Sequence, residues 1–95
     1  MTARAQQAYV EGLQRIPGVL RAAVYGGDTA AEQTVLVVLP SLRGPVADQV
    51  IDLEGEVRHA YPGSRLEIEI KSLAERRLRE DEADSLVPPD ARVFL

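Results

Sequence analysis

The sequence predicts an α+β fold with two layers, in which a three- or four-stranded mixed sheet carries helices mainly on one face. Three observations lead to this fold class. Residues 45–61 repeat apolar side chains at helical spacing, residues 65–71 alternate apolar and charged side chains, and two β-type runs flank a short polar turn. The predicted order is helix, strand, strand, helix, strand, helix, and the pattern leaves open whether residues 92–95 add a last strand.

The first half of the chain predicts a helix followed by a hairpin. Residues 2–16 place apolar side chains at helical spacing, and Pro17-Gly18 ends the helix. Residues 19–25 and 34–39 read as strands, and their connection is short enough for an antiparallel pair.

The second half begins with the clearest helix, which Pro45 can start. Its apolar stripe consists of Val46, Val50, Leu53, Val57 and Tyr61. The strand at 65–71 then points Leu66, Ile68 and Ile70 inward. Because a full helix separates this strand from the one before it, parallel pairing by a crossover is expected. Residues 73–84 predict a charged helix.

Composition limits the classes of function. A chain of 95 residues forms one domain, residues 1–95, because it has no room for two independent cores. It contains no cysteine, which excludes disulfides and thiolate chemistry. A net charge of −4 argues against nucleic acid as a partner. No apolar run approaches the roughly 20 residues of a membrane span, so a soluble protein with no membrane partner is expected. The first residues contain no apolar signal core, which predicts a cytoplasmic protein. Arginine far outnumbers lysine, and alanine and valine are abundant, which favours a bacterial source.

The second strand is apolar on both faces, and this predicts an interface. The two main helices can cover one face of the sheet, so the other face needs a second cover. We expect that cover to be a second subunit, making the protein a homo-oligomer, most simply a dimer. The interface would include Leu36, Val38 and Tyr25. The alternative cover is the tail, through Leu73, Leu78, Val87, Val93 and Phe94.

The glycine pair Gly26-Gly27 is open to two interpretations. It forms a tight turn, or its backbone N–H groups form a nest that binds an anion. His59 lies on the polar side of its helix, where a solvated role is favoured. Glu67 and Glu69 share one face of a strand with Lys71, which favours a charge-balanced surface over a metal site.

The chain from about residue 8 to residue 95 resembles the minimal nucleotidyltransferase core. The resemblance rests on Ala23-Val24-Tyr25-Gly26-Gly27, on residues 34–40, on Leu66-Glu67-Ile68-Glu69-Ile70 and on the closing residues 86–95. In that family the second strand carries an Asp-x-Asp pair for divalent metal and a later strand adds a third acid. Here the pair falls at Thr34 and Leu36, Gly27 replaces the turn serine, and Glu67 or Glu69 stands for the third acid. The resemblance therefore implies a degenerate copy without catalytic residues or a metal site.

These observations lead to one expectation with two alternatives. We expect a small non-catalytic accessory or interaction domain that self-associates, has a protein as partner and uses no cofactor. The alternatives are a divergent nucleotidyltransferase-like enzyme and a module that binds an anion or nucleotide at Gly26 and Gly27.

Overall fold

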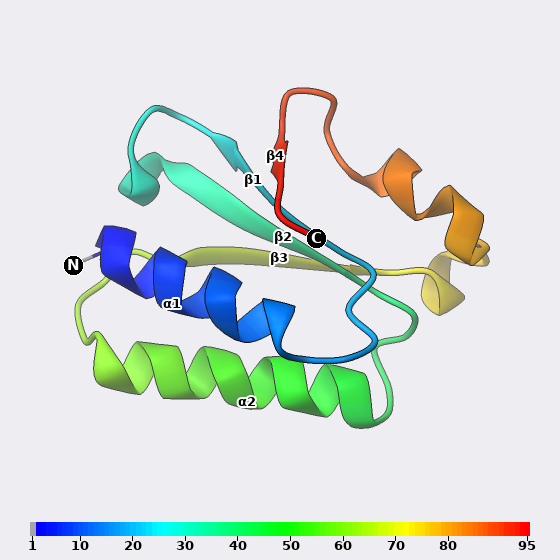
Figure 1. The fold of residues 1–95 in the computed structure, drawn as a ribbon, viewed down its shortest axis with the longest axis horizontal. Coiled ribbons are helices and arrows are strands. Elements are labelled where there is room, and N and C mark those ends of the chain that lie inside the picture. The colour runs from blue at the N-terminus through cyan, green and yellow to red at the C-terminus, as the bar shows by residue number, and fades with distance from the viewer. Residues whose placement is uncertain (1) are drawn as a thin grey trace.

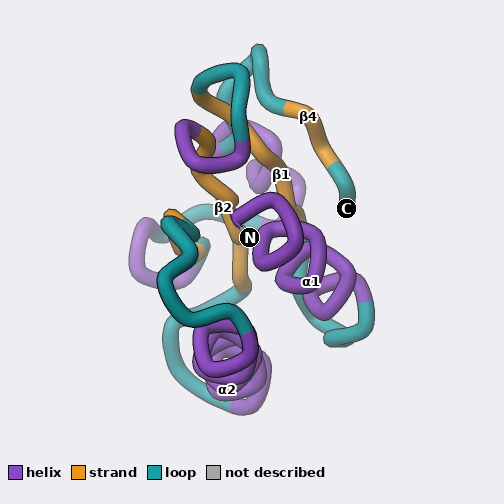
Figure 2. The backbone as a smooth tube through the Cα atoms, turned by 90° about the vertical axis from the view of Figure 1, so that its left-hand side faces the viewer, coloured by secondary structure: helices purple, strands orange, loops and turns teal. Residues whose placement is uncertain are grey.

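The computed structural model describes residues 2–95 and shows the predicted α+β architecture. Its elements, with η for 3-10 helices, are α1 (Thr2–Gln14), β1 (Arg21–Gly26), η1 (Ala30–Glu32), β2 (Gln33–Leu39), α2 (Pro45–Ala60), β3 (Glu67–Ser72), η2 (Ala74–Arg76), η3 (Glu80–Leu86) and β4 (Arg92–Val93). The sheet order is β3-β2-β1-β4. β1 is antiparallel to β2 and β4, whereas β2 and β3 are parallel. Figures 1 and 2 show α1 and α2 together on one side of this sheet.

The face of the sheet toward the helices holds the larger core. Tyr9 and Leu13 of α1 and Val50 of α2 are fully buried there against Val35 and Val37 of β2. The predicted apolar stripe of α2 does pack on this core, although Val46, Leu53 and the β3 side chains Ile68 and Ile70 are only partly buried. The strict alternation of β3 therefore places its apolar residues as predicted.

The C-terminal segment covers the opposite face of the sheet. Leu36 and Val38 are 0% exposed, and they share a second core with Leu73 and Ala83. Further partly buried cover comes from Leu20, Tyr25, Leu78, Leu86 and Val87. The interface at Leu36 and Val38 was predicted on the premise that a second subunit must cover this face. The tail already covers it, so that premise does not hold.

The tail also departs from the predicted charged helix. Residues 73–84 contain η2 and the first part of η3 instead of one α-helix. Arg77 between them adopts a left-handed backbone conformation, with φ 57°, which interrupts the helical path. The break lets Leu78 turn toward the sheet and join the second core. Phe94 and Val93 do not belong to this cover, because Phe94 packs on the core of the helix face and Val93 is 53% exposed.

Gly18 is required where α1 leads into β1. It has φ +99°, and a Cβ added to it would lie 2.6 Å from Val46 Cγ2. We expect Gly18→Ala to lower the free energy of unfolding by about 1–3 kcal/mol, because alanine disfavours this backbone conformation. Gly55→Ala in α2 is the control, since its added Cβ meets no atom of residues 2–95 within 4 Å beyond its own stretch of helix, and the helix should gain about 0.5–1 kcal/mol. Urea unfolding of both variants measures the difference, and shifts of the same sign would contradict it.

Candidate interaction surface

The Gly26-Gly27 turn carries a carboxylate of its own. A Cβ added to Gly27 would lie 2.6 Å from Glu32 Oε2, so this acid lies directly against the turn. The Thr29 hydroxyl donates to Glu32 Oε1 at 2.9 Å, and the Gly27 N–H donates to the Glu32 backbone oxygen at 3.3 Å. The negative charge of Glu32 disfavours a bound anion here. This geometry supports a tight turn.

The residues of the nucleotidyltransferase resemblance lie side by side but do not form an acidic cluster. In the parallel register Thr34 lies opposite Glu67, and Leu36 lies opposite Glu69. Leu36, which the resemblance matched to a metal-binding aspartate, is apolar and fully buried. Among residues 2–95, no group of three or more His, Asp or Glu side chains is placed to hold a metal ion. His59 is exposed near the end of α2.

Of the three predicted interface residues, Tyr25 alone is within reach of the surface. Its side chain is partly buried, and its hydroxyl donates to Glu69 Oε2 at 3.1 Å. Desolvation, together with this hydrogen bond to a carboxylate, raises the pKa of the Tyr25 hydroxyl. Tyr25 of β1 therefore holds Glu69 of β3 across β2, on the face of the sheet that the tail covers.

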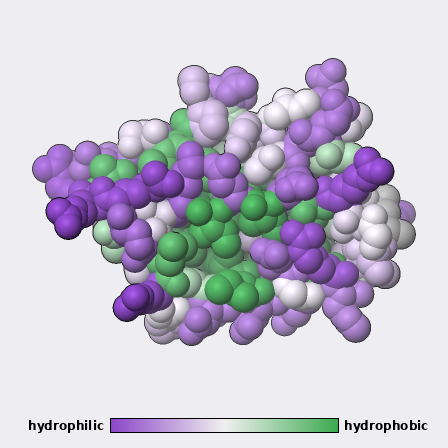
Figure 3. Space-filling view, turned by 180° about the vertical axis from the view of Figure 1, so that it is seen from behind, coloured by the Kyte–Doolittle hydropathy of each residue, from purple (hydrophilic) through white to green (hydrophobic). Residues whose placement is uncertain are grey.

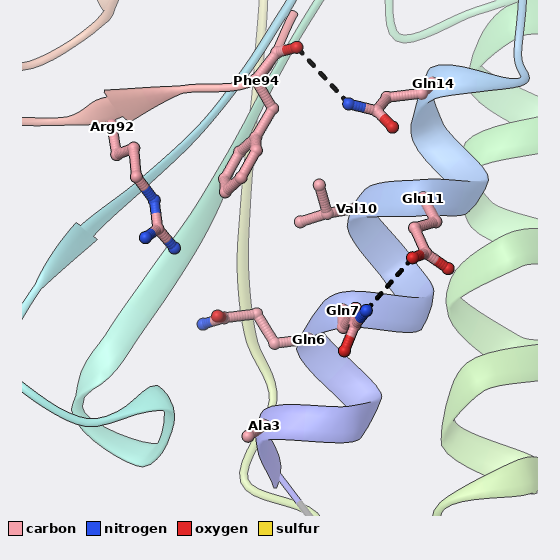
Figure 4. A pocket seen from close by; sticks show the side chains of 8 residues that line it. All are labelled: Ala3, Gln6, Gln7, Val10, Glu11, Gln14, Arg92 and Phe94. Carbon is pink, nitrogen blue, oxygen red and sulfur yellow. Dashed lines mark hydrogen bonds between the residues drawn. The ribbon is translucent and has the colours of Figure 1, made fainter.

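A groove of about 400 Å³ lies between α1 and β4 (Figure 4). Its lining consists of Ala3, Gln6, Gln7, Val10, Glu11, Gln14, Arg92 and Phe94. The polar side chains pair within the chain: Gln6 with Gln33 at 3.2 Å, Gln7 with Glu11 at 3.2 Å, and Gln14 with the Phe94 carbonyl at 3.5 Å. The Arg92 guanidinium lies 5.1 Å from the centre of the Phe94 ring. Because these polar groups are engaged within the chain, the groove offers no defined recognition pattern.

The free edge of β3 is the longer open edge of the sheet. β3 has six residues, and it pairs with β2 on one side while its other side ends the sheet. The Leu73 N–H donates to the Leu39 carbonyl at 3.0 Å. The backbone N–H and C=O groups of successive residues in a strand point to opposite sides. Because the N–H of Leu73 points toward β2, the odd-numbered residues of β3 direct these groups toward β2. The even-numbered residues Ile68 and Ile70 therefore direct theirs outward, toward the free edge. No hydrogen bond within residues 2–95 engages these outward groups.

A cluster of hydrogen-bonded side chains occupies the C-terminal end of β3, which we call its closed end. Ser72 is 3% exposed, and its hydroxyl contacts the Glu75 carboxylate. Glu75 also accepts the Leu42 N–H at 2.9 Å and the Ser41 hydroxyl at 3.3 Å. These hydrogen bonds, that of Ser72 above all, lower the pKa of Glu75. The cluster leaves the stretch from Glu67 to Lys71 as the open part of the edge.

Apolar side chains of α2 and β3 lie beside this edge. Ile51 of α2 is 58% exposed, and Ile68 and Ile70 are partly buried. Arg58, almost two helical turns beyond Ile51, donates to the Leu66 carbonyl at 2.9 Å, which orients this side of α2 toward β3. Figure 3 shows hydrophobic residues gathered in the middle of the rear face. We call Ile51, Ile68 and Ile70 together with the β3 backbone the β3 edge surface.

Sequence reasoning found part of this surface. It identified the alternation of Glu67, Ile68, Glu69 and Ile70, yet it assigned the interface to Leu36 and Val38 of β2 and Tyr25 of β1. The signal for Ile51 was present, because an isoleucine outside the apolar stripe of an amphipathic helix is an exposed apolar residue. No local pattern marks β3 as an edge strand, because the sheet order depends on long-range pairing.

Comparison with known proteins identifies no protein similar to this chain. No helix among residues 2–95 combines the length and the apolar character that a membrane crossing requires. No protein-family model, no curated protein and no solved structure matches the chain.

Proposed function

We propose that this chain is a small non-catalytic interaction domain that associates with a second copy of itself. The observation that carries the proposal is the β3 edge surface. An edge strand with unpaired backbone groups is a template for another strand. Neighbouring apolar side chains provide the water-excluding contact that backbone pairing needs.

Self-association is tested by measuring mass against concentration. Sedimentation velocity or light scattering on the purified chain is expected to show a rise from one to two chain masses as the concentration increases. The mass should return to that of one chain on dilution. A single chain mass across the whole series would contradict self-association.

The non-catalytic part of the proposal needs a separate experiment. The chain is incubated with each nucleoside triphosphate and Mg²⁺ or Mn²⁺, and label transfer to an acceptor is followed. No transfer above background is expected, because two-metal chemistry needs clustered acids and residues 2–95 contain no group of three or more His, Asp or Glu side chains placed to hold a metal ion. Metal-dependent transfer that Glu67→Gln abolishes would contradict the proposal in favour of the nucleotidyltransferase-like enzyme. Nucleotide binding without transfer would favour the binding module.

A further inference from the structure

We propose that two copies of this chain pair antiparallel along β3, with Ile68 of one protomer facing the partner's Ile70 across a two-fold axis at Glu69. This inference rests on the proposed function and adds the partner and the register. Pairing in this way joins two four-stranded sheets into one continuous sheet. Both helical layers then lie on the same side of it.

The backbone supports this register. A two-fold axis perpendicular to the sheet places the same face of both copies on the same side. Since side chains alternate between the two faces along a strand, two residues that face each other must both be even-numbered or both be odd-numbered. The outward N–H and C=O groups belong to Ile68 and Ile70. Facing Ile68 with the partner's Ile70 therefore uses every outward group of the open stretch. It leaves the closed end at Ser72 outside the interface.

The charges of β3 favour an antiparallel second copy. On the face toward the tail, the strand carries Glu67 and Glu69 near its start and Lys71 near its end. In the proposed register Glu67 faces the partner's Lys71, and the symmetric pair forms on the other side of the axis. Opposite charges at facing positions stabilise a strand pair. A parallel arrangement in register would place acid beside acid and lysine beside lysine.

The axis itself brings Glu69 opposite its own copy. Facing like charges destabilise a strand pair, so this contact weakens the dimer. Each Glu69 has compensating neighbours within its own chain. Lys71 Nζ lies 3.3 Å from Glu69 Oε1, and the Tyr25 hydroxyl donates to Oε2. The association is therefore expected to be reversible, and its strength should depend on the charge at position 69.

The helical side of the interface is formed by Ile51. α2 lies on the helix face beside β3 (Figure 2). In the proposed pair, the two-fold axis would bring the α2 helices of both copies next to each other. Ile51 projects from this side with 58% of its surface exposed. The same surface that is apolar and accessible in one chain then becomes covered in the pair.

A charge exchange between positions 67 and 71 tests the register. Glu67→Lys alone places two lysines opposite each other, and Lys71→Glu alone places two acids opposite each other. Each variant alone is expected to raise the dissociation constant at least about tenfold. A mixture of the two variants restores both opposite-charge pairs and should associate as tightly as the original chain. Sedimentation of each variant and of the mixture measures this.

The matched control is the pair Glu11→Lys and Arg15→Glu, two exposed residues with the same spacing; Glu11 belongs to α1 and Arg15 directly follows it. These variants and their mixture should associate like the original chain. Glu69→Gln should lower the dissociation constant, because it removes the like charges at the axis and keeps an acceptor for Tyr25. Ile51→Asp should raise it, and its exposed position keeps the variant folded even if Lys71→Glu does not fold.

The outcomes separate the register from the function. If the original chain dimerises but the Glu67 and Lys71 variants associate as tightly alone as when mixed, the β3 register is wrong and self-association stands. Weaker association after Glu69→Gln would also overturn the register. If the original chain stays at one chain mass at every concentration, the proposed function fails together with this inference.

Discussion

Replacing Val38 with aspartate is expected to unfold the chain. Val38 is 0% exposed in the core between β2 and the C-terminal segment. A carboxylate placed there without a partner costs several kcal/mol, comparable with the total of about 5–15 kcal/mol that stabilises a domain. Far-ultraviolet circular dichroism on heating should show no cooperative transition, or one at a much lower temperature.

The control for this substitution is Val93→Asp. Val93 is also a strand valine, but it is 53% exposed on β4. Its replacement should change the free energy of unfolding by about 0.5 kcal/mol or less. A Val38→Asp protein that stays folded but loses self-association would restore the interface first predicted at this position.

Truncating Tyr9 to alanine is expected to lower the free energy of unfolding by about 3–5 kcal/mol. Tyr9 is one of the largest fully buried side chains and lies on α1 in the core with α2. Its loss would leave a cavity that the two helices cannot close without moving. Guanidinium unfolding monitored by circular dichroism measures the change, and a loss below about 1 kcal/mol would contradict the packing.

Tyr9→Phe should act in the opposite direction. The Tyr9 hydroxyl is buried, and it has no hydrogen-bond partner within residues 2–95. Burial, reinforced by the charge of Glu54, raises the pKa of this hydroxyl far above its usual range, so it stays protonated. Removing an unsatisfied hydroxyl while keeping the ring should raise the free energy of unfolding by about 1 kcal/mol. A destabilised Tyr9→Phe protein would show that the hydroxyl makes a favourable contact.

The parts of the fold that the sequence predicts well are those with strong periodicity. The stripe through Val50 and Val57 marked α2, and the helix ends at Ala60, one residue before the predicted end. The alternation at 65–71 marked β3, whose strand runs over Glu67–Ser72. Hydrophobic periodicity depends only on residues close together in the sequence, so it can be detected without knowledge of the tertiary contacts.

The cover of the second face was predicted as an alternative, and its details depend on tertiary contacts. Leu73, Leu78 and Val87 do cover β2, as the tail alternative stated. Ala83 completes this core at 1% exposure, although it lies in a highly charged segment. A single small apolar residue among acids produces no periodic pattern in the sequence. The segment also forms the 3-10 helix η3 instead of a regular α-helix, so helical spacing does not reveal its buried side.

The position of the β3 edge surface could not be read from local sequence. The alternation of β3 fits an edge strand and a central strand equally well. β3 lies at the edge because β4 pairs with β1 at the far side of the sheet, a contact between residues about seventy positions apart. The exposure of Ile51 points to an interface only when the structure shows that α2 lies beside β3.

The position of β4 also determines when the chain can fold during synthesis. β1 is made early, yet the Ala22 carbonyl accepts the Phe94 N–H at 2.7 Å, and Leu36 is covered by residues from 73 onward. A nascent chain that has released only its first seventy residues exposes one face of β2 and one edge of β1. Exposed apolar faces and unpaired edges of this kind promote aggregation and attract chaperones. Native packing therefore has to wait until Phe94 has emerged from the ribosome, and contacts of such long range slow the folding step itself.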